Sequence, residues 1–325
     1  MERSIRWGIL GAASFAERVM GRAIHAARGA ELAALATRSA EKAARFAAFA
    51  PGLRVHDDYD ALLADAAVDA VYIPLPNTLH AEWTQRALDA GKAVLCEKPV
   101  GMSVAEIDRM IAARDRAGRL AAEAYMIVHH PQWQRARALI AEGAIGAVAE
   151  VECAFSIDQR DPANIRNQQA LGGGGLRDLG VYPIGAARFA MGAEPELTAA
   201  TARWENGVDT HAEVVGRIGG ARFAFRTSTR MAPWQEMTFH GEDGLIRLTA
   251  PFNPVDYAPA ELHLIRSPAE RSVERFPAAL QYVAQVEAFG ASIETGAAYP
   301  VPLEWSRGTQ ALIDAVFERV GPPTG

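Results

Sequence analysis

Short apolar runs alternate with longer amphipathic segments over the first 125 residues of the chain. This alternation is typical of strand–helix units in a parallel sheet, in which each strand is buried on both faces and each helix on one. The apolar runs predict strands at 5–10, 31–36, 69–73, 93–96 and 120–124, and the segments between them predict helices near 15–27, 40–50, 78–90 and 104–117. Helix N-caps are expected at Ser39, Asn77 and Ser103, and helix ends at Gly91 and Gly118. We therefore predict a doubly wound α/β domain over residues 1–125.

After about residue 145 the apolar pattern changes to longer alternating segments. These predict strands at 147–157, 198–205, 212–218, 221–229, 236–240 and 245–248, and helical spacing predicts helices near 131–142, 178–191, 280–294 and 303–319. The Gly219-Gly220 pair and the Glu242–Gly244 segment are typical of tight turns between antiparallel strands. We predict a second α/β domain over residues 126–325, built on an open, mostly antiparallel sheet.

Composition supports two cores and excludes some classes of partner. The 325 residues are 50% hydrophobic, which is enough apolar material for two domains. The formal net charge of -6 provides no basic field for nucleic acid or for an anionic membrane surface. Cys96 and Cys153, far apart in sequence, predict neither a disulfide framework nor a metal site. No secretory leader or bilayer-spanning run stands out, so we expect a soluble cytoplasmic protein.

The first predicted strand leads into a degenerate form of the G-x-G-x-x-G dinucleotide-binding turn. Gly11 can make the sharp bend, while Ala13 and Ala16 stand where the second and third glycines would be. The turn opens a helix whose N-terminal amides and dipole would face a pyrophosphate. An ordinary strand-to-helix turn is the alternative interpretation. The residues expected to contact the dinucleotide here are Gly11, Ala12, Ala13, Ser14 and Phe15.

The end of the second predicted strand bears on the choice between the two nicotinamide cofactors. A domain that prefers NAD usually has an acidic residue there, whereas this chain has Thr37, Arg38 and Ser39. Arg38 would pair with a 2′-phosphate, and the two hydroxyls could add hydrogen bonds. We therefore predict NADP(H) as the preferred cofactor, with NAD(H) possible; the alternative is that Arg38 belongs to a solvated helix start.

Two further turns follow buried strands and should lie at the carboxyl edge of the sheet, where ligands bind in open α/β folds. The first contains Pro76, Asn77 and His80, and the second contains Glu97 and Lys98. We expect these residues to line the cofactor site. The alternatives are an ion pair between Lys98 and Glu97 that fixes its turn, and a buried structural role for His80.

A glycine-rich segment at 172–175 precedes Asp178 and Tyr182, which lie four apart and should share one helix face. Glycines let a backbone approach a ligand closely. The oxidation of an alcohol requires removal of the hydroxyl proton, and a tyrosine can accept it if a nearby ammonium, here Lys98, favours the phenolate. The alternative is a core aromatic at Tyr182 and an N-cap at Asp178.

Three weaker candidates could contact the substrate. Asn164 and Arg166 precede the glycines and could bind sugar hydroxyls, although loop arginines are often solvated. His130 could line the cleft, and a buried structural histidine is an equal alternative.

These motifs together resemble the family named after glucose-fructose oxidoreductase, inositol dehydrogenase and the rhizopine catabolism protein. The resemblance covers nearly the whole chain and rests on WGILGAASFA at 7–16, PLPNTLHAEW at 74–83, CEKPV at 96–100, HPQW at 130–133 and GGGGLRDLGVYPI at 172–184. Within this family, the motif sequences are most similar to those of the branch of NADP-using sugar dehydrogenases and dihydrodiol dehydrogenases. One departure is Val128, where that branch commonly has an arginine.

The resemblance implies a Rossmann domain followed by a substrate and dimerisation domain, with Lys98, Asp178 and Tyr182 as the catalytic group. Lys98 would polarise the substrate oxygen and lower the pKa of Tyr182, Tyr182 would carry the proton, and Asp178 would hold Lys98 or a substrate hydroxyl. The implied reaction is oxidation of a cyclic aldose with NADP, or the reverse reduction of a carbonyl. Dihydrodiol or cyclic polyol oxidation, ping-pong transfer with a non-dissociating cofactor and a dinucleotide sensor without turnover are alternatives. A homodimer or a dimer of dimers is also implied.

Overall fold

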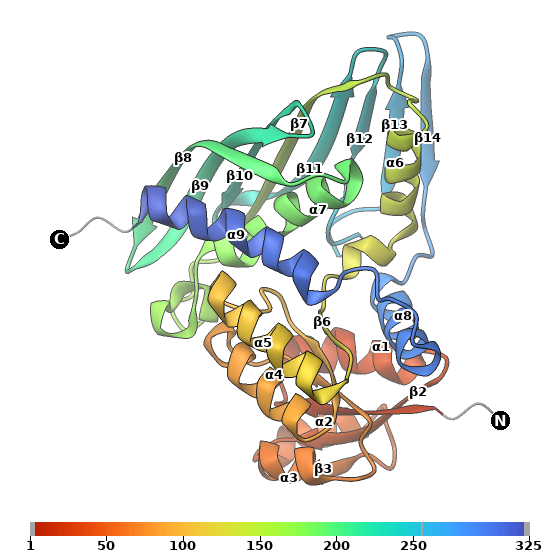
Figure 1. Cartoon of the computed structure of the whole chain (residues 1–325), viewed down its shortest axis with the longest axis vertical. Coiled ribbons are helices and arrows are strands. Elements are labelled where there is room, and N and C mark those ends of the chain that lie inside the picture. The colour runs from red at the N-terminus through yellow and green to blue at the C-terminus, as the bar shows by residue number, and fades with distance from the viewer. Residues whose placement is uncertain (1–3, 255, 322–325) are drawn as a thin grey trace. The chain divides into compact units, whose positions relative to one another are not determined.

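The computed structural model of the chain describes residues 4–254 and 256–321. The chain forms two units and passes between them three times (Figure 1). The first unit combines residues up to 126 with 280–307, and the second combines 127–279 with the residues from 308 onward. The sequence indicates a single boundary near residue 125, whereas the structure returns residues 280–307 to the first unit.

The first unit contains a parallel sheet of six strands in the order β3-β2-β1-β4-β5-β6. This is the strand order of the doubly wound dinucleotide-binding fold. The strands are β1 (Ile5–Leu10), β2 (Ala30–Ala36), β3 (Arg54–His56), β4 (Ala70–Ile73), β5 (Ala93–Cys96) and β6 (Ala121–Glu123). Strands β4 and β5 are buried throughout, as expected for central strands covered on both faces.

Helices connect these strands, and most of the expected helix ends are confirmed. The elements are η1 (Ala16–Met20), α1 (Gly21–Ala26), α2 (Ala40–Ala47), α3 (Tyr59–Ala64), η2 (Asn77–Leu79), α4 (His80–Asp89), α5 (Val104–Ala117) and η3 (Met126–His129), of which η3 crosses into the second unit. Ser39 and Ser103 accept hydrogen bonds from backbone amides three residues ahead, as N-caps do. Asn77 was wrongly expected to cap a helix, because it begins the short 3₁₀ turn η2 instead.

The end of the chain completes the first unit. Helix α8 (Gln281–Thr295) packs on α1 and β2, and helix α9 (Leu303–Val320) begins in this unit and ends in the second. Phe289 of α8 lies against Trp7 of β1, with ring centroids 5.3 Å apart. Tyr282 of the same helix lies edge-on to Phe15 at 5.6 Å. The C-terminal segment therefore covers the first strand and reaches the predicted dinucleotide turn.

The second unit is built on a sheet of eight strands in the order β14-β13-β12-β11-β7-β10-β9-β8. The strands are β7 (Val148–Asp158), β8 (Pro195–Glu205), β9 (Val208–Ile218), β10 (Ala221–Ser228), β11 (Arg230–Gly241), β12 (Leu245–Leu248), β13 (Glu261–Ile265) and β14 (Arg271–Arg275). Every neighbouring pair is antiparallel except β7 and β10, which run parallel. The turns at 219–220 and 242–244 join antiparallel strands as predicted, and both Gly219 and Gly220 have positive φ.

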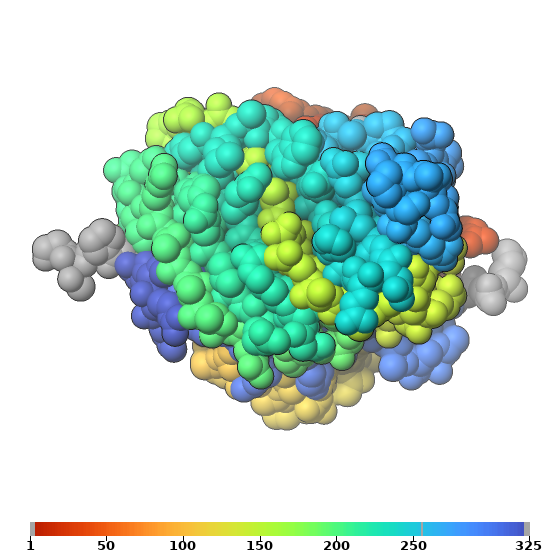
Figure 2. Space-filling view, turned by 90° about the horizontal axis from the view of Figure 1, so that it is seen from above, coloured from red at the N-terminus to blue at the C-terminus, as the bar shows by residue number. Residues whose placement is uncertain are grey.

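Helices cover one face of this sheet. Helix α7 (Val181–Met191) packs on β7 and β9, and α6 (Pro131–Ala141) packs on α7 and β13. Between them in sequence lie the short elements η4 (Ile165–Asn167), η5 (Gln169–Leu171) and η6 (Leu176–Gly180). Side chains alternate along β10, where Phe223 and Phe225 face the core and Arg222 and Arg226 face outward. Figure 2 looks onto that outer face, which strand side chains form.

Candidate active site

The predicted dinucleotide turn lines an open pocket of about 580 Å³ at the carboxyl edge of the first unit's sheet. Gly11, Ala12 and Ala13 form one wall, and Pro76 from the turn after β4 forms another. Gly11 has φ +95°, and a Cβ there would meet Leu75 at 3.1 Å, so this position favours glycine. Ser14 and Phe15 follow at the start of the π-helical turn η1, where an α-helix was expected. This turn between a strand and a helix lies where dinucleotide-binding folds place the pyrophosphate.

The residues after β2 form the far side of the same pocket. Thr37, Arg38, Ser39 and Lys42 all line it. The Thr37 Oγ1 accepts a hydrogen bond from the Ser39 amide at 3.2 Å, which shapes the turn. Arg38 is exposed, and within residues 4–254 and 256–321 no acceptor pairs with its guanidinium. An unpaired arginine and an exposed lysine at this pocket fit the 2′-phosphate of NADP(H).

Sequence reasoning missed the aromatic and acidic residues that complete the pocket. Tyr59 and Trp83 line it and meet edge-to-face at 4.8 Å, and Arg86 lies over the Trp83 ring at 4.1 Å. Asp57, Asp58 and Asp60 belong to the same lining. Tyr59 begins α3, which follows the three-residue strand β3. Neither element has an apolar pattern long enough to be recognised, so the only available signal was an aromatic residue between polar ones.

The turn after β5 holds the Glu97 side chain within the first unit. The Tyr72 hydroxyl donates a hydrogen bond to Glu97 Oε1 at 2.6 Å, and the Lys98 amide donates to Oε2 at 3.2 Å. Burial raises the pKa of Glu97, while the Tyr72 hydroxyl and the Lys98 ammonium oppose this rise. Both carboxylate oxygens of Glu97 therefore accept hydrogen bonds that fix the conformation of this turn. The Lys98–Pro99 peptide bond in this turn is cis.

His80, which we expect at the cofactor site, lies buried between two turns of the first unit. The residue is fully buried, and its Nδ1 lies 2.8 Å from the Pro99 carbonyl oxygen while its Nε2 lies 2.8 Å from that of Leu75. Both ring nitrogens are therefore engaged by backbone atoms. His80 joins the turn after β4 to the turn that carries Lys98, which is the structural role considered as its alternative.

The glycine-rich segment of the second unit makes room for the chain's own atoms, whereas we expected it to approach a ligand. A Cβ on Gly173 would lie 2.5 Å from the Ile165 carbonyl oxygen, and one on Gly174 would collide with the Asp209 carboxylate. The Gly174 amide donates to the Arg166 carbonyl oxygen at 2.9 Å. The glycines thus dock the preceding loop against β9.

Asp178 and Arg166 form a bidentate ion pair. The Arg166 Nε lies 2.5 Å from Asp178 Oδ2, and Nη2 lies 3.3 Å from Oδ1. Asp178 raises the pKa of Arg166, and Tyr182 adds a smaller contribution in the same direction. The Asn164 side-chain oxygen accepts the Arg166 amide at 3.1 Å. The predicted residues Asn164, Arg166, Asp178 and Tyr182 are thus brought together in one unit.

Tyr182 is the second residue of α7, which directly follows the π-helical turn η6 that contains Asp178. We expected a regular α-helix across both residues. The Tyr182 ring packs edge-on to Phe155 at 5.5 Å and lies tilted against Phe252 at 5.2 Å. Only 6% of the residue is exposed. Its ring is therefore held by aromatic neighbours, and π-helical turns of this kind occur frequently at functional sites.

Asp209 of β9 is a buried carboxylate that sequence reasoning missed. Its Oδ2 accepts the Leu176 amide at 2.6 Å, at the start of η6, and only 2% of the residue is exposed. Burial raises the pKa of Asp209 to about 6, and the Leu176 amide and the Arg177 guanidinium limit that rise. No sequence pattern marks this residue, because it reaches η6 only through the folding of the sheet.

The raised pKa of Asp209 predicts a pH dependence of stability. Folded protein holds this proton more tightly than unfolded protein between about pH 4 and 6, so the contribution of Asp209 to the free energy of unfolding falls as the pH rises through that range. Asp209→Asn keeps an acceptor oxygen for Leu176 but does not titrate. Urea unfolding of both proteins from pH 4 to 7.5 should therefore show the variant gaining on the wild type by about 3 kcal/mol. Parallel stability curves would contradict this interpretation.

His130 also has a structural position. It is fully buried at the N-cap of α6, and its Nδ1 accepts the Gln132 amide at 3.1 Å. Burial lowers the pKa of His130 to about 4, so the ring is neutral at physiological pH. The second ring nitrogen, Nε2, is buried without a hydrogen-bond partner among the described residues, and contact of His130 with the substrate stays a prediction.

No group of three or more His, Cys, Asp or Glu side chains within residues 4–254 and 256–321 is arranged to hold a metal ion. No helix in those ranges combines the length and the apolar character that crossing a bilayer requires.

Comparison with known proteins matches both parts of the chain. A family model described as the oxidoreductase family with an NAD-binding Rossmann fold matches residues 5–125, and a GFO/IDH/MocA C-terminal domain model matches residues 133–247. An uncharacterized oxidoreductase of Rhizobium meliloti is 40% identical over 320 residues, which cover 96% of each chain. A D-xylose 1-dehydrogenase (NADP(+)) of Haloferax volcanii is 35% identical over 315 residues, again 96% of each chain.

The fold is also similar to a solved structure. KijD10, a 3-ketoreductase from Actinomadura kijaniata crystallised with NADP and TDP-benzene, superposes with a TM-score of 0.91 at 32% identity, over 98% of each chain. The NADP bound to KijD10 is the cofactor that fits the pocket at Arg38 in the present chain.

Proposed function

Because the chain belongs to the Gfo/Idh/MocA family of NAD(P)-dependent oxidoreductases, we propose that it transfers a hydride between NADP(H) and a ring carbon of a cyclic sugar. It is an enzyme that acts on CH–OH groups, with NADP(H) as its cofactor. The sensor alternative is thereby set aside. The observation that carries the choice of reaction is the grouping of Asp178 and Tyr182 with Arg166 on one helix start of the second unit.

The first unit's residues bind and orient the cofactor. Gly11 to Ala13 present backbone amides to the pyrophosphate, and Arg38 with Lys42 holds the 2′-phosphate. The bound nicotinamide supplies the hydride acceptor for oxidation and the donor for reduction. The wall formed by Tyr59 and Trp83 gives the open pocket an apolar side.

Lys98 and Tyr182 handle the proton. The Lys98 ammonium polarises the substrate oxygen and favours the phenolate of Tyr182. The Tyr182 hydroxyl oxygen takes the proton from the carbinol during oxidation and returns it during reduction. His80 and Glu97 fix the turn that carries Lys98, while Phe155 and Phe252 fix the Tyr182 ring.

Asp178 acts together with Arg166. The bidentate pair fixes the direction of the carboxylate, so that it can accept a hydrogen bond from Lys98 or from a substrate hydroxyl. The role of Arg166 is therefore to orient Asp178, and contact with the sugar is secondary.

The substrate is either a free cyclic aldose or a sugar that carries a ketone. The aldose is our first candidate, since the xylose dehydrogenase is similar over nearly the whole chain. A keto sugar linked to a nucleotide is the second, favoured by the likeness to KijD10. Dihydrodiols and cyclic polyols belong to the same chemical class.

Assays in both directions separate these candidates. Aldoses, inositols and cyclic diols would be tested with NADP⁺ and with NAD⁺, and a dTDP-linked keto sugar with NADPH, by following nicotinamide absorbance. Turnover of an aldose with NADP⁺ supports the first candidate, and consumption of NADPH with the keto sugar alone supports the second. Failure of every substrate, despite tight NADPH binding, would contradict the proposed reaction.

Replacement of Arg38 by alanine should weaken the binding of NADP⁺ by about 10- to 100-fold, because a charge-assisted pair with phosphate is lost. The affinity for NAD⁺ should change less than about twofold. Quenching of the protein's tryptophan fluorescence during titration with NADP⁺ and with NAD⁺ measures the two dissociation constants. Arg109→Ala, on a helix outside this pocket, is the control, and equal losses for both cofactors would remove Arg38 from the 2′-phosphate site.

We also propose that the outer face of the second unit's sheet pairs two copies of the chain. This face, seen in Figure 2, carries a hollow of about 360 Å³. Trp234, which is 48% exposed, borders that hollow. An exposed tryptophan among charged side chains is common at interfaces. Sedimentation equilibrium tests the proposed homodimer or dimer of dimers, and a monomer at micromolar concentration would refute it. We retain the cytoplasm as its proposed location.

A further inference from the structure

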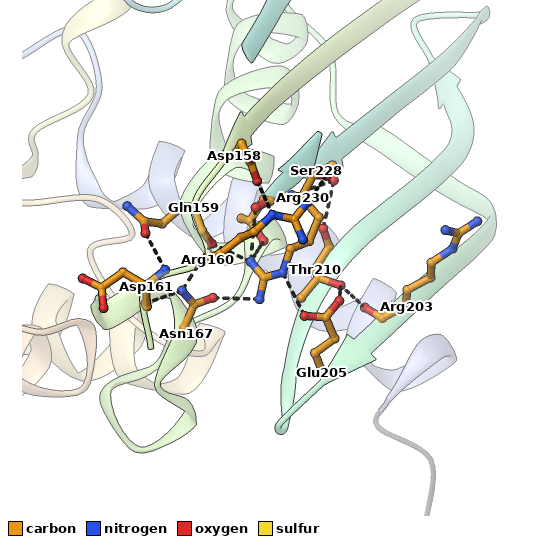
Figure 3. A network of polar contacts seen from close by, with 11 residues as sticks. Asp158, Gln159, Arg160, Asp161, Asn167, Arg203, Glu205, Thr210, Ser228 and Arg230 are labelled. Atoms are coloured by element: carbon orange, nitrogen blue, oxygen red, sulfur yellow. Dashed lines mark hydrogen bonds and ion pairs between the residues drawn. The ribbon is translucent and has the colours of Figure 1, made fainter. Parts of the chain in front are cut away.

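The Arg230 side chain joins three parts of the second unit (Figure 3). Its Nε donates to Glu205 Oε2 at 2.8 Å, at the end of β8. Its Nη1 donates to the Gln159 carbonyl oxygen at 2.6 Å, just after β7. Its Nη2 donates to Asn167 Oδ1 at 2.9 Å, in η4. The Arg230 side chain is 16% exposed, and its bonds to Gln159 and Asn167 are partly buried, whereas the bond to Glu205 is exposed.

The guanidinium of Arg230 is itself fixed to the sheet. Nη1 also contacts the Thr229 carbonyl and hydroxyl oxygens, each at 3.1 Å. The Arg230 amide donates to Ser228 Oγ at 3.1 Å, and that hydroxyl donates to the Thr210 carbonyl oxygen at 3.1 Å. A planar fork of donors can satisfy acceptors in several directions at once, which a single ammonium cannot. Arg230 is thus a rigid anchor.

The anchor acts on the loop that carries Arg166. Asn167, held by Arg230, donates through Nδ2 to the Asp161 carbonyl oxygen at 2.7 Å, which closes the loop on itself. Arg166 precedes Asn167 in η4 and extends to Asp178. The short helix η4 is therefore bonded to Arg230 of the sheet through Asn167, and to Asp178 through Arg166.

We propose that Arg230 is a positioning residue, which holds Asn167 so that Arg166 keeps the Asp178 carboxylate oriented for the reaction. This inference rests on the proposed function, since it is Asp178 that faces the chemistry. Arg230 touches neither reacting atoms nor Asp178, and it acts only through η4.

Kinetics of Arg230→Gln test the proposal, with Arg203→Gln as the matched control. Arg203 is an exposed arginine of β8 whose side chain points away from Arg230 in Figure 3. Arg230→Gln should lower kcat by up to about a hundredfold, because small displacements of an orienting group are costly, and NADPH binding should be unchanged. Arg230→Lys should recover only part of that loss. A kcat equal to that of the Arg203→Gln control would overturn the inference.

A double variant separates positioning from general stabilisation. If Arg230 acts only through Arg166, then adding Arg230→Gln to Arg166→Gln should reduce kcat by less than about twofold further. A full additional loss in the double variant would mean that Arg230 supports activity by another route and would refute the proposal.

Hydrogen exchange gives a readout that needs no substrate. The Gly173 and Gly174 amides bond to the loop at Gln168 and Arg166. They should exchange at least about tenfold faster in Arg230→Gln than in the wild type, and at the wild-type rate in Arg203→Gln. Faster exchange in a protein that turns over no sugar would support the anchoring role while refuting the proposed reaction. Unchanged exchange would overturn the anchoring role whatever the activity.

Discussion

Replacement of Lys98 by methionine is expected to lower kcat by about 10³-fold or more while NADPH binding stays within about twofold of the wild type. Methionine keeps the length and the apolar stem of the side chain but removes the ammonium that polarises the substrate oxygen. The fixed turn around it should persist, because His80 bonds to the Pro99 and Leu75 carbonyl oxygens and Glu97 to the Tyr72 hydroxyl. Steady-state kinetics and NADPH fluorescence titration measure the two quantities.

The chain has only three lysines, Lys42, Lys92 and Lys98, and the same substitution at Lys42 is the control for this experiment. Lys42→Met removes an ammonium at the cofactor pocket and should weaken NADP(H) binding with little change in kcat. Activity above about a tenth of the wild-type value in Lys98→Met would contradict a role for Lys98 in the chemical step.

Replacement of Tyr182 by phenylalanine is expected to lower kcat by about 10²- to 10³-fold, since it removes the proton-carrying hydroxyl alone. The ring should keep its contacts with Phe155 and Phe252, so the free energy of unfolding should change by less than about 1 kcal/mol. Kinetics and urea unfolding of the same preparation measure both effects. Tyr257→Phe in the same unit is the control, and full activity in Tyr182→Phe would assign proton transfer to another group.

Much of the fold could be predicted because buried elements have a recognisable pattern of apolar residues in the sequence. Strands such as β1 and β5 are covered on both faces and appear as continuous apolar runs. Strands β3, β13 and β14 were missed because each is short or largely exposed, so neither an apolar run nor a clean alternation marks it. The fold class and the family were therefore predicted correctly, while these edge elements were not.

The candidate site could be predicted only where a local motif defines it. Gly11 and Arg38 lie in motifs whose chemistry follows from their place after a strand, and the structure brings both to one pocket. Asp209 and Arg230 could not be found, because each reaches its partners through strand pairing between distant segments. The glycines at 172–175 were misinterpreted for the same reason, since their close neighbours come from the preceding loop and from β9.

The return of residues 280–307 to the first unit affects how the protein can be made on a ribosome. Trp7 is fully buried, and Phe289 is among the residues that cover it. The first strand therefore emerges long before the helix that packs on it has been synthesised. We expect the dinucleotide-binding unit to complete its folding only near the end of translation, after residues 127–279 of the second unit have left the exit tunnel. A nascent chain that stops at residue 279 would carry a folded sheet with an exposed tryptophan, a state that chaperones recognise.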